Sequence, residues 1–278
     1  MLPKIVTASP YLRENAPHVK SCLLVGPQGS GKTMLLNAIC TELEATLFDL
    51  TATNIVGRYP GKSGLNMLLH LVLKVSRLVQ PAIIFIDQAE KTFLKKVSKT
   101  DKSDPKRLKK DLPRLVRSLA SEDCVMLIGA SRMPWECEQK GLTLTYQKML
   151  VLPVPDYSFR CCLWKELILS RNGNITKHER FDVSSLSKVS EGYSAGSIFK
   201  AVETIMTDRR ILQQKMRPLQ PIEFVGSLAK CEPIYKEEAE AYIAWYSKTP
   251  TGKKRYKVLE GDDEGGKKEK KSGKKKKK

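Results

Sequence analysis

The segment Gly26–Thr33, with the sequence GPQGSGKT, constrains the fold more than any other part of the chain. It matches the pattern G-x-x-x-x-G-K-[S/T], in which glycines let backbone N–H groups surround a phosphate without Cβ clashes. The apolar run SCLLV precedes it, and a helical pattern beginning at Lys32 follows it. A strand, a glycine loop and a helix N-terminus in this order form an anion site. We therefore predict a nucleotide-binding α/β protein. A chance glycine turn is the alternative, and the order of the three elements argues against it.

The motif assigns a role to each position of this loop. The Lys32 side chain would reach the β- and γ-phosphates, and the Thr33 hydroxyl would bind Mg²⁺. ATP or ADP with Mg²⁺ is accordingly the predicted ligand. The other residues of the predicted nucleotide-binding loop are Gly26, Pro27, Gln28, Gly29, Ser30 and Gly31.

A second part of the site is predicted in the segment IIFIDQAE, residues 83–90. Asp87 follows four apolar residues, so we expect it at the end of a strand beside the phosphate loop, holding Mg²⁺ directly or through water. The next position, where a general base would stand, is Gln88. An amide cannot take a proton near neutral pH, and losing a positioned general base lowers the rate by about 10²–10⁴. A glutamine orients the attacking water in some GTPases, so Gln88 argues for slow hydrolysis more firmly than for none.

Glu90 is a candidate substitute for the missing base, because it lies two residues further along the chain. The two-residue shift changes its direction, and the favoured reading is a surface acid or an acid in the first turn of a helix. The residues alone therefore leave open whether the protein is an enzyme.

The rest of the chain alternates short apolar runs with amphipathic stretches, as in βαβ units with a parallel sheet. Helices are predicted at 32–43, 64–78, 107–119 and 158–170, and the strands stop near residue 172. Two helices around a glycine turn are expected within 181–214, with shorter ones at 223–230 and 237–246. We divide the chain into an N-terminal remnant (1–18), an α/β core (19–172), a helical lid (173–247) and a disordered lysine-rich tail (248–278). The predicted strands are 21–26, 46–50, 82–87, 124–130 and 148–154.

Composition excludes several classes of protein. The net charge of +19 is concentrated in residues 91–117 and 267–278, so it describes two local features and not the whole surface. These segments contain few aromatic residues for stacking on bases, and we do not expect nucleic acid to be a partner. No apolar segment is long enough to cross a membrane or to act as a secretory signal. The seven scattered cysteines are typical of reduced thiols in a cytoplasmic protein.

Several motifs in order resemble those of AAA-family ATPases, from about residue 19 to residue 212. The resemblance implies a P-loop NTPase core with a parallel five-stranded sheet, followed by a small helical lid. It also implies that Tyr59 occupies the place of an aromatic residue that grips a threaded polypeptide; an ordinary turn between Pro60 and Gly61 is an equally good reading. The motifs are VGRYPGKSG (56–64), LIGASRMP (127–134), LPVPD (152–156) and EGYSAGSIFKAV (191–202).

Within that family, the chain resembles the IQ-motif-and-AAA-domain-containing proteins, which are linked to the nexin–dynein regulatory complex of motile cilia. This resemblance implies a cytoskeletal location in the ciliary axoneme, protein partners that include tubulin as a candidate, and a homo- or hetero-oligomer. The IQ motifs are absent, so the chain resembles the C-terminal part of a longer protein. The segments that carry the resemblance are YPGKSG, DPKRLKKDL, KVSEGY and WYSKTPTGKK, together with the lysine-rich end.

Departures from the family pattern all concern hydrolysis. Arg132 replaces the asparagine of the sensor-1 strand, and Leu142 and Thr145 stand about where arginine fingers would be, with Lys148 as the nearest cation. Arginine fingers contribute roughly 10³–10⁵ to the rate where they occur. We therefore predict an ATP-binding module with weak or absent hydrolysis and a structural or regulatory role. Gln88, Glu90 and Arg132 are the candidate catalytic positions. An active ATPase that remodels or threads polypeptides is the alternative.

Overall fold

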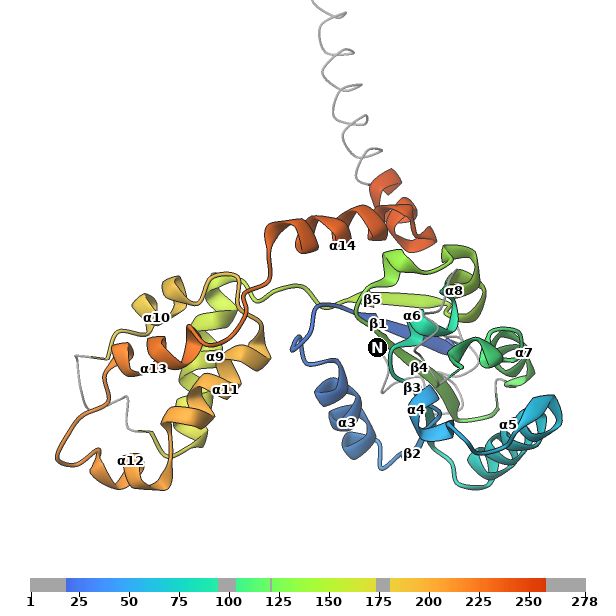
Figure 1. Ribbon diagram of the computed structural model, residues 1–278, viewed down its shortest axis with the longest axis horizontal. Coiled ribbons are helices and arrows are strands. Elements are labelled where there is room, and N and C mark those ends of the chain that lie inside the picture. The colour runs from blue at the N-terminus through green and yellow to red at the C-terminus, as the bar shows by residue number, and fades with distance from the viewer. Residues whose placement is uncertain (1–18, 95–103, 121, 174–180, 259–278) are drawn as a thin grey trace, which may run out of the picture.

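A single parallel sheet forms the centre of the molecule. The computed structural model describes residues 19–94, 104–120, 122–173 and 181–258. The sheet has five strands in the order β2-β3-β4-β1-β5, and every neighbouring pair is parallel (Figure 1). All five predicted strands are confirmed to within a few residues. The strands are β1 (Ser21–Val25), β2 (Thr46–Asp49), β3 (Ala82–Ile86), β4 (Val125–Ser131) and β5 (Lys148–Val151).

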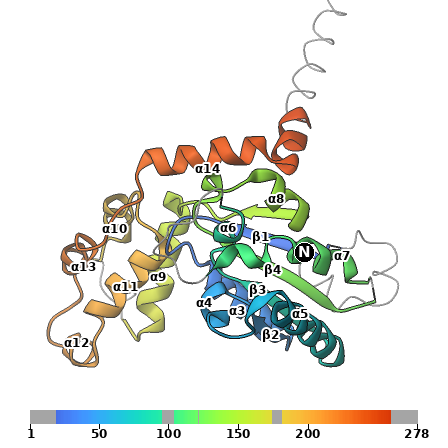
Figure 2. The same cartoon turned by 45° about the vertical axis from the view of Figure 1, so that its right-hand side comes forward.

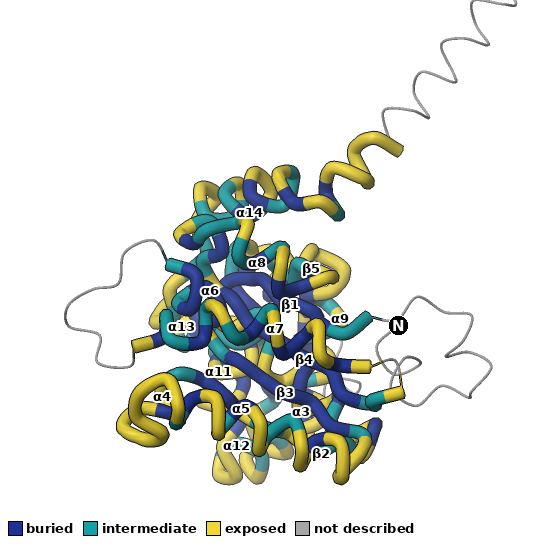
Figure 3. Tube along the Cα trace, turned by 90° about the vertical axis from the view of Figure 1, so that its right-hand side faces the viewer, coloured by how far each residue is buried: buried dark blue, intermediate teal, exposed yellow. Residues whose placement is uncertain are grey.

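The three central strands are buried on both faces, which explains their continuously apolar sequences (Figure 3). Successive side chains point to opposite faces of a strand. In β1, Leu23 and Val25 accordingly join one hydrophobic cluster, whereas Cys22 and Leu24 join another. The two clusters form the core on either side of the sheet.

Helices cover these two faces unequally. Helix α3 (Lys32–Glu42) packs on the face of Cys22 and Leu24 through Leu36 and Ile39. The other face is covered by α5 (Gly61–Leu78), α7 (Asp111–Ser118) and α8 (Gln139–Thr145). Short elements lie between them: α4 (Ala52–Ile55), α6 (Ala89–Thr92) and the 3-10 turns η1 (Pro105–Leu108) and η2 (Pro134–Glu136).

The predicted helix over 107–119 is broken into η1 and α7. Pro113 explains the break, because proline has no N–H and fits a helix only in its first turn. The chain therefore starts a new helix at Asp111, which places Pro113 at the third helical position.

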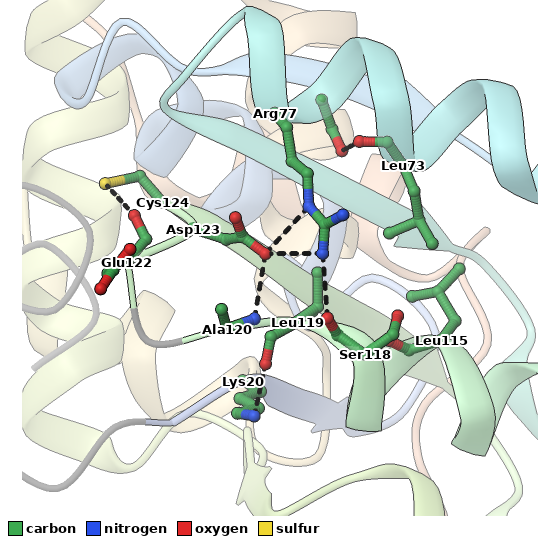
Figure 4. A network of polar contacts seen from close by, with 11 residues as sticks. Lys20, Leu73, Arg77, Leu115, Ser118, Leu119, Ala120, Glu122, Asp123 and Cys124 are labelled. Atoms are coloured by element: carbon green, nitrogen blue, oxygen red, sulfur yellow. Dashed lines mark hydrogen bonds and ion pairs between the residues drawn. The ribbon is translucent and has the colours of Figure 1, made fainter.

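A polar network ties α5, α7 and the start of β4 together at the edge of the sheet where the strands begin (Figure 4). Arg77, in the last turn of α5, donates through Nε to Asp123 Oδ2 at 3.0 Å and through Nη2 to the Ser118 carbonyl at 2.9 Å. The same Asp123 oxygen accepts the Ala120 N–H at 2.9 Å. This network fixes the loop between α7 and β4, opposite the edge that carries the phosphate loop.

The chain leaves the sheet after β5 and forms a lid with a hydrophobic core of its own. Trp164 and Phe181 both contact Phe224 edge-to-face, with ring centroids 5.6 and 6.1 Å apart. Where two helices were expected within 181–214, the structure has three, because a further short helix starts at Asp208. The lid helices are α9 (Tyr157–Ser170), α10 (Val183–Val189), α11 (Ala195–Ile205), α12 (Asp208–Gln213) and α13 (Pro221–Leu228).

A bidentate ion pair in the lid predicts a pH-dependent stability. Arg210 donates to both carboxylate oxygens of Glu223, at 2.8 and 2.9 Å, and these hydrogen bonds lower the pKa of Glu223 from its ordinary 4.5. A lowered folded-state pKa stabilises the protein above the unfolded-state pKa, and this contribution is lost as the pH falls through the folded value. Glu223→Gln should therefore lower the free energy of unfolding by about 1 kcal/mol at pH 7.

Urea unfolding at several pH values measures this effect. The difference between wild type and Glu223→Gln should stay constant down to about pH 5 and shrink below pH 4.5. Glu203→Gln is the matched control, because Glu203 pairs with Arg171 through side chains that are 54% and 42% exposed. It should leave stability nearly unchanged. A difference for Glu223→Gln that does not shrink at all as the pH falls below 4.5 would contradict the assignment.

Helix α14 (Lys236–Lys248) crosses from the lid back to the α/β core (Figures 1 and 2). Its Tyr242 and Trp245 are buried in the core cluster, and Tyr242 packs edge-to-face on Trp135 of η2 at 4.9 Å. The division of the chain at residues 173–247 placed this helix in the lid; its packing belongs to the core. The predicted disorder from residue 248 is also wrong for residues 250–258, which are helical, whereas 1–18 and 259–278 lie outside the described residues.

Two expectations from composition can be compared with the structure. All seven cysteines are free thiols, and burial raises the pKa of Cys22 to about 11, against a smaller opposite effect of Lys148. Among the residues that the structure describes, no helix is both long and apolar enough to span a bilayer.

Candidate nucleotide site

The predicted site residues meet at the edge of the sheet where the strands end, because the phosphate loop follows β1, Asp87 follows β3 and Arg132 follows β4. Ligands of open parallel sheets bind at this edge. The strand of Asp87 was expected beside the phosphate loop, but β4 lies between β1 and β3. Arg132, at the end of the intervening strand, is therefore placed between the two halves of the site.

The phosphate loop has the backbone that an anion site needs. Gly29 and Gly31 have φ angles of 78° and 90°, a region open to glycine and strained for other residues. Gly31 begins α3 without any side-chain cap, so the N–H groups of its first turn remain available to a ligand. Lys32 Nζ donates to the carbonyls of Gly26 and Pro27, each at 2.8 Å, and holds the loop around itself.

Burial lowers the pKa of Lys32, and the positive charge of Arg132 acts in the same direction. Three carboxylates oppose this effect, those of Asp87, Glu90 and Glu238, with Asp87 the strongest. The charges of both halves of the site thus act on one ammonium group. Glu238 belongs to α14, and no sequence motif indicated that it lies near the site.

The groups predicted to hold Mg²⁺ fit that ion. Thr33 lies in the first turn of α3 with its side chain exposed. Asp87 is half-buried; its Oδ1 accepts the Gln88 N–H at 2.8 Å, which leaves Oδ2 without a hydrogen-bond partner among the described residues. No group of three or more His, Cys, Asp or Glu side chains in the described part of the chain could hold a metal. One carboxylate and one hydroxyl, completed by phosphate oxygens and water, are the ligands that Mg²⁺ uses in nucleotide sites.

The two candidate bases occupy different environments. Gln88 is exposed and adopts a left-handed conformation, with φ 50° and ψ 45°, immediately before α6. Glu90 lies in the first turn of α6 and is only 6% exposed, so the expectation of a surface acid is wrong and that of a helix-N-terminal acid is confirmed. Its Oε1 accepts the Arg132 N–H at 3.3 Å, and its Oε2 is buried without a partner in the described structure.

Arg132 links the phosphate loop to α14. Its exposed guanidinium donates through Nη1 to Gln28 Oε1 at 2.8 Å, and its carbonyl accepts a hydrogen bond from the Tyr242 hydroxyl. A cation therefore stands at the mouth of the loop where the family pattern has an asparagine. Burial raises the pKa of Tyr242 above its ordinary value of 10, so its hydroxyl stays a donor further into the alkaline range.

The positions compared with arginine fingers hold no cation. Leu142 and Thr145 are both completely buried in α8, and the Thr145 hydroxyl donates to the Gly141 carbonyl at 3.0 Å. Lys148, the nearest cation, is exposed on β5. These two α8 positions therefore serve packing and cannot reach a neighbouring subunit.

Tyr59 lies in the turn between α4 and α5, with φ 53° and 36% of its surface exposed. Arg107, in η1, donates through Nη2 to the Tyr59 carbonyl at 2.8 Å. This contact fixes the turn and leaves the Tyr59 ring partly exposed.

The lid touches the phosphate loop directly. The Gly196 N–H donates to the Gly29 carbonyl at 2.8 Å, and a Cβ added at Gly29 would collide with the Ser194 hydroxyl. Ser194 caps α11 by accepting the Ser197 N–H. The glycine at position 29 is therefore required by its backbone angles and also by the closeness of the lid.

Comparing Gly29→Ala with a second glycine substitution separates the cost of the backbone angles from the cost of the lid contact. Gly57→Ala is the matched control, because Gly57 has a similar φ of 71° and nothing within 4 Å of an added Cβ. Both changes should cost about 1–2 kcal/mol for the left-handed backbone. Gly29→Ala should cost about 1 kcal/mol more, from the collision. Urea unfolding measures the difference, which should shrink in a Ser194→Ala background; equal losses for the two variants would refute the lid contact.

Comparisons with known proteins agree with this geometry. The family profile described as "ATPase family associated with various cellular activities (AAA)" matches residues 22–149. The chain is 45% identical over 257 residues to Dynein regulatory complex protein 11 of Mus musculus, covering 90% of this chain. It is 25% identical over 249 residues to Katanin p60 ATPase-containing subunit A1 of Strongylocentrotus purpuratus and 28% identical over 239 residues to Spastin of Xenopus laevis, covering 81% of this chain in each case.

The chain spans 30% of the length of Dynein regulatory complex protein 11, 47% of the katanin subunit and 39% of that Spastin. In structure, it resembles the AAA domain of FIGL-1 in complex with ADP, with a TM-score of 0.66 and 21% identity. That similarity covers 88% of this chain and 85% of the FIGL-1 chain. The profile match, the order of the motifs along the chain and the P-loop fold together show that the chain belongs to the AAA family of ATPases.

Proposed function

We propose that this chain is an ATP-binding AAA module with weak or absent hydrolysis, which serves a structural or regulatory role in a dynein regulatory assembly of the ciliary axoneme. The observation that carries the proposal is Gln88. It follows the metal-holding Asp87 and presents an exposed amide where a base is needed, while the loop of Lys32 is complete.

The other changes point in the same direction. Glu90 is only 6% exposed and its Oε1 accepts the backbone N–H of Arg132, which speaks against its use as a substitute base. Leu142 and Thr145 are buried in place of arginine fingers. Binding and hydrolysis are thus affected separately, and nucleotide acts as a stabilising ligand. At 100 times its dissociation constant, a ligand adds about 2.7 kcal/mol to stability.

The location and partners follow from the relatives. The similarity to Dynein regulatory complex protein 11 supports a place in the cytoplasm, on the cytoskeleton of the cilium, with other proteins of that assembly as partners in a homo- or hetero-oligomer. Lys110, Arg114 and Arg117 are exposed along α7. A cationic surface of this kind suits an acidic partner such as the tubulin tails.

An active ATPase that remodels or threads polypeptides or cytoskeletal partners is the second candidate. It is supported by the similarity to a katanin subunit and to Spastin, and by the exposed Tyr59 in the turn before α5. In this case Gln88 would orient the attacking water without deprotonating it.

Steady-state ATP turnover, with Lys32→Ala as the background control, distinguishes the two candidates. The proposed function predicts turnover far below about 1 s⁻¹, together with ATP or ADP binding that calorimetry detects. Lys32-dependent turnover near 1 s⁻¹ would establish the remodelling enzyme instead. Failure to bind either nucleotide would refute both.

A further inference from the structure

The hydroxyl of Thr51 joins the ends of two neighbouring strands beside the site. Thr51 follows β2 and is 8% exposed, and its hydroxyl donates to Asp49 Oδ1. The same oxygen of Thr51 accepts the backbone N–H of Asp87 at 3.0 Å. The hydroxyl therefore has a defined direction: its proton points toward Asp49 Oδ1, and one of its lone pairs points toward the Asp87 N–H.

Asp49 is fully committed to holding this arrangement. Its Oδ1 also accepts the Thr51 N–H at 2.9 Å, and its Oδ2 accepts Asn54 Nδ2 at 2.8 Å. Both of its carboxylate oxygens thus accept from protein donors, in three hydrogen bonds that connect Asp49 to Thr51 and Asn54. Its role is to fix the rotamer of Thr51.

Helix capping does not explain the position of the Thr51 hydroxyl. Thr51 is the residue that precedes α4, where a threonine usually accepts a hydrogen bond from an N–H in the first turn. Here it makes no such bond, and the hydroxyl turns toward Asp87 instead. The structure thus uses this side chain for the neighbouring strand and not for its own helix.

The hydrogen bond from the Asp87 N–H to the Thr51 hydroxyl holds the backbone of Asp87 in place. The position of this backbone determines where the Asp87 carboxylate points. Asp87 Oδ1 accepts the Gln88 N–H at 2.8 Å, and Gln88 itself is held in a left-handed conformation. The Asp87 N–H is fixed from one side and its Oδ1 from the other, whereas Oδ2 has no hydrogen-bond partner among the residues that the structure describes. Partners of this kind, one step removed from a metal, typically change metal affinity about 10–100-fold when they are removed.

We infer that Thr51, held by Asp49, is a positioning residue that directs the Asp87 carboxylate toward the divalent cation of a bound nucleotide. This inference rests on the proposed nucleotide binding and deepens it, because it assigns the metal dependence of binding to a hydroxyl that no motif includes. Thr51 does not touch the cation; it acts through the backbone of Asp87.

The test measures the affinity of the full chain for a fluorescent ATP analogue, once with Mg²⁺ and once with EDTA. The ratio of the two affinities is the metal enhancement. Thr51→Val keeps the shape of the side chain and removes the hydroxyl, and it should lower the enhancement about 10-fold. Its affinity in EDTA should stay within about twofold of wild type, because a lost structural hydrogen bond away from the phosphates does not act on them. Thr51→Ser retains the hydroxyl and should restore the wild-type ratio.

Asp49 provides a second pair of variants that does not depend on the folding of Thr51→Val, because its side chain is exposed. Asp49→Asn removes the charge but keeps an oxygen that accepts from Thr51, and it should retain the metal enhancement. Asp49→Ala removes that acceptor and should lower the enhancement. Equal ratios for these two variants would overturn the inference.

Other results have separate meanings. A Thr51→Val protein that folds and retains the wild-type enhancement overturns the inference, as does wild-type binding that is the same in Mg²⁺ and EDTA. Wild-type protein that binds no nucleotide in either condition refutes the proposed function instead.

Discussion

Lys32→Ala should weaken ATP binding at least about 100-fold. The ammonium group of Lys32 lies inside the phosphate loop, where it donates to the Gly26 and Pro27 carbonyls and where its burial lowers its pKa. A bound phosphate would accept two hydrogen bonds from the ammonium group in place of these carbonyls. Each bond would contribute about 1.5 kcal/mol to binding, because it joins a cation to an anion. Each 1.4 kcal/mol corresponds to a factor of about ten in affinity. Isothermal titration with ATP and ADP measures the loss.

Lys110→Ala is the matched control for this change. Lys110 is an exposed residue immediately before α7, far in sequence from the phosphate loop, and its removal changes the net charge of the protein by the same amount. ATP affinity should be unchanged within about twofold, because Lys110 makes none of the hydrogen bonds of the phosphate loop and salt screens exposed charges. If Lys110→Ala weakened binding as much as Lys32→Ala, the effect would come from overall charge, and the phosphate loop would not be the site.

Gln88→Glu should raise ATP turnover about 10²-fold. The new carboxylate would stand directly after Asp87, on an exposed position where it displaces no other side chain. A positioned general base contributes about 10²–10⁴ to the rate, and the left-handed backbone of Gln88 already accepts a residue of this size. The variant should still turn over more slowly than about 1 s⁻¹, since the buried Leu142 and Thr145 supply no arginine finger.

Two further variants are needed to interpret the turnover of Gln88→Glu. Gln88→Ala removes the amide without adding a base and should not raise turnover above that of wild type. Combining Gln88→Glu with Lys32→Ala should abolish the gain at an ATP concentration that saturates only the protein with Lys32, because Lys32→Ala weakens nucleotide binding. A Gln88→Glu protein with wild-type turnover would show that the missing base is not what limits hydrolysis. The limit would then lie in Arg132 or in the absence of arginine fingers.

The strands could be predicted from the sequence because each is a short apolar run that must be covered on both faces. The run AIIFI of β3, for example, is buried at every position. The phosphate loop was equally clear, since its glycines are needed for one backbone geometry. The order of the strands could not be predicted, because nothing in the sequence of β4 shows that it lies between β1 and β3.

Prediction from the sequence failed where a contact joins segments that are far apart in the chain. The burial of Glu90 depends on the backbone of Arg132, and the arrangement of Arg132 depends on Gln28 and on Tyr242, which lie 104 and 110 residues away. Helix α14 was assigned to the lid because it follows the lid helices. Only the packing of its Trp245 against the core shows where it belongs. The Thr51 hydroxyl was missed because a threonine before a helix has an ordinary explanation.

The return of α14 to the core also limits how the lid can move. The lid helices α9–α13 leave the core after β5 and rejoin it at α14, whose Tyr242 and Trp245 are buried there. A rigid body connected at one point can rotate about three axes. Connected at two points, it can rotate only about the line through them. A lid that moved as a rigid body over the phosphate loop would therefore rotate about one axis, and this rotation would make or break the Gly196–Gly29 hydrogen bond.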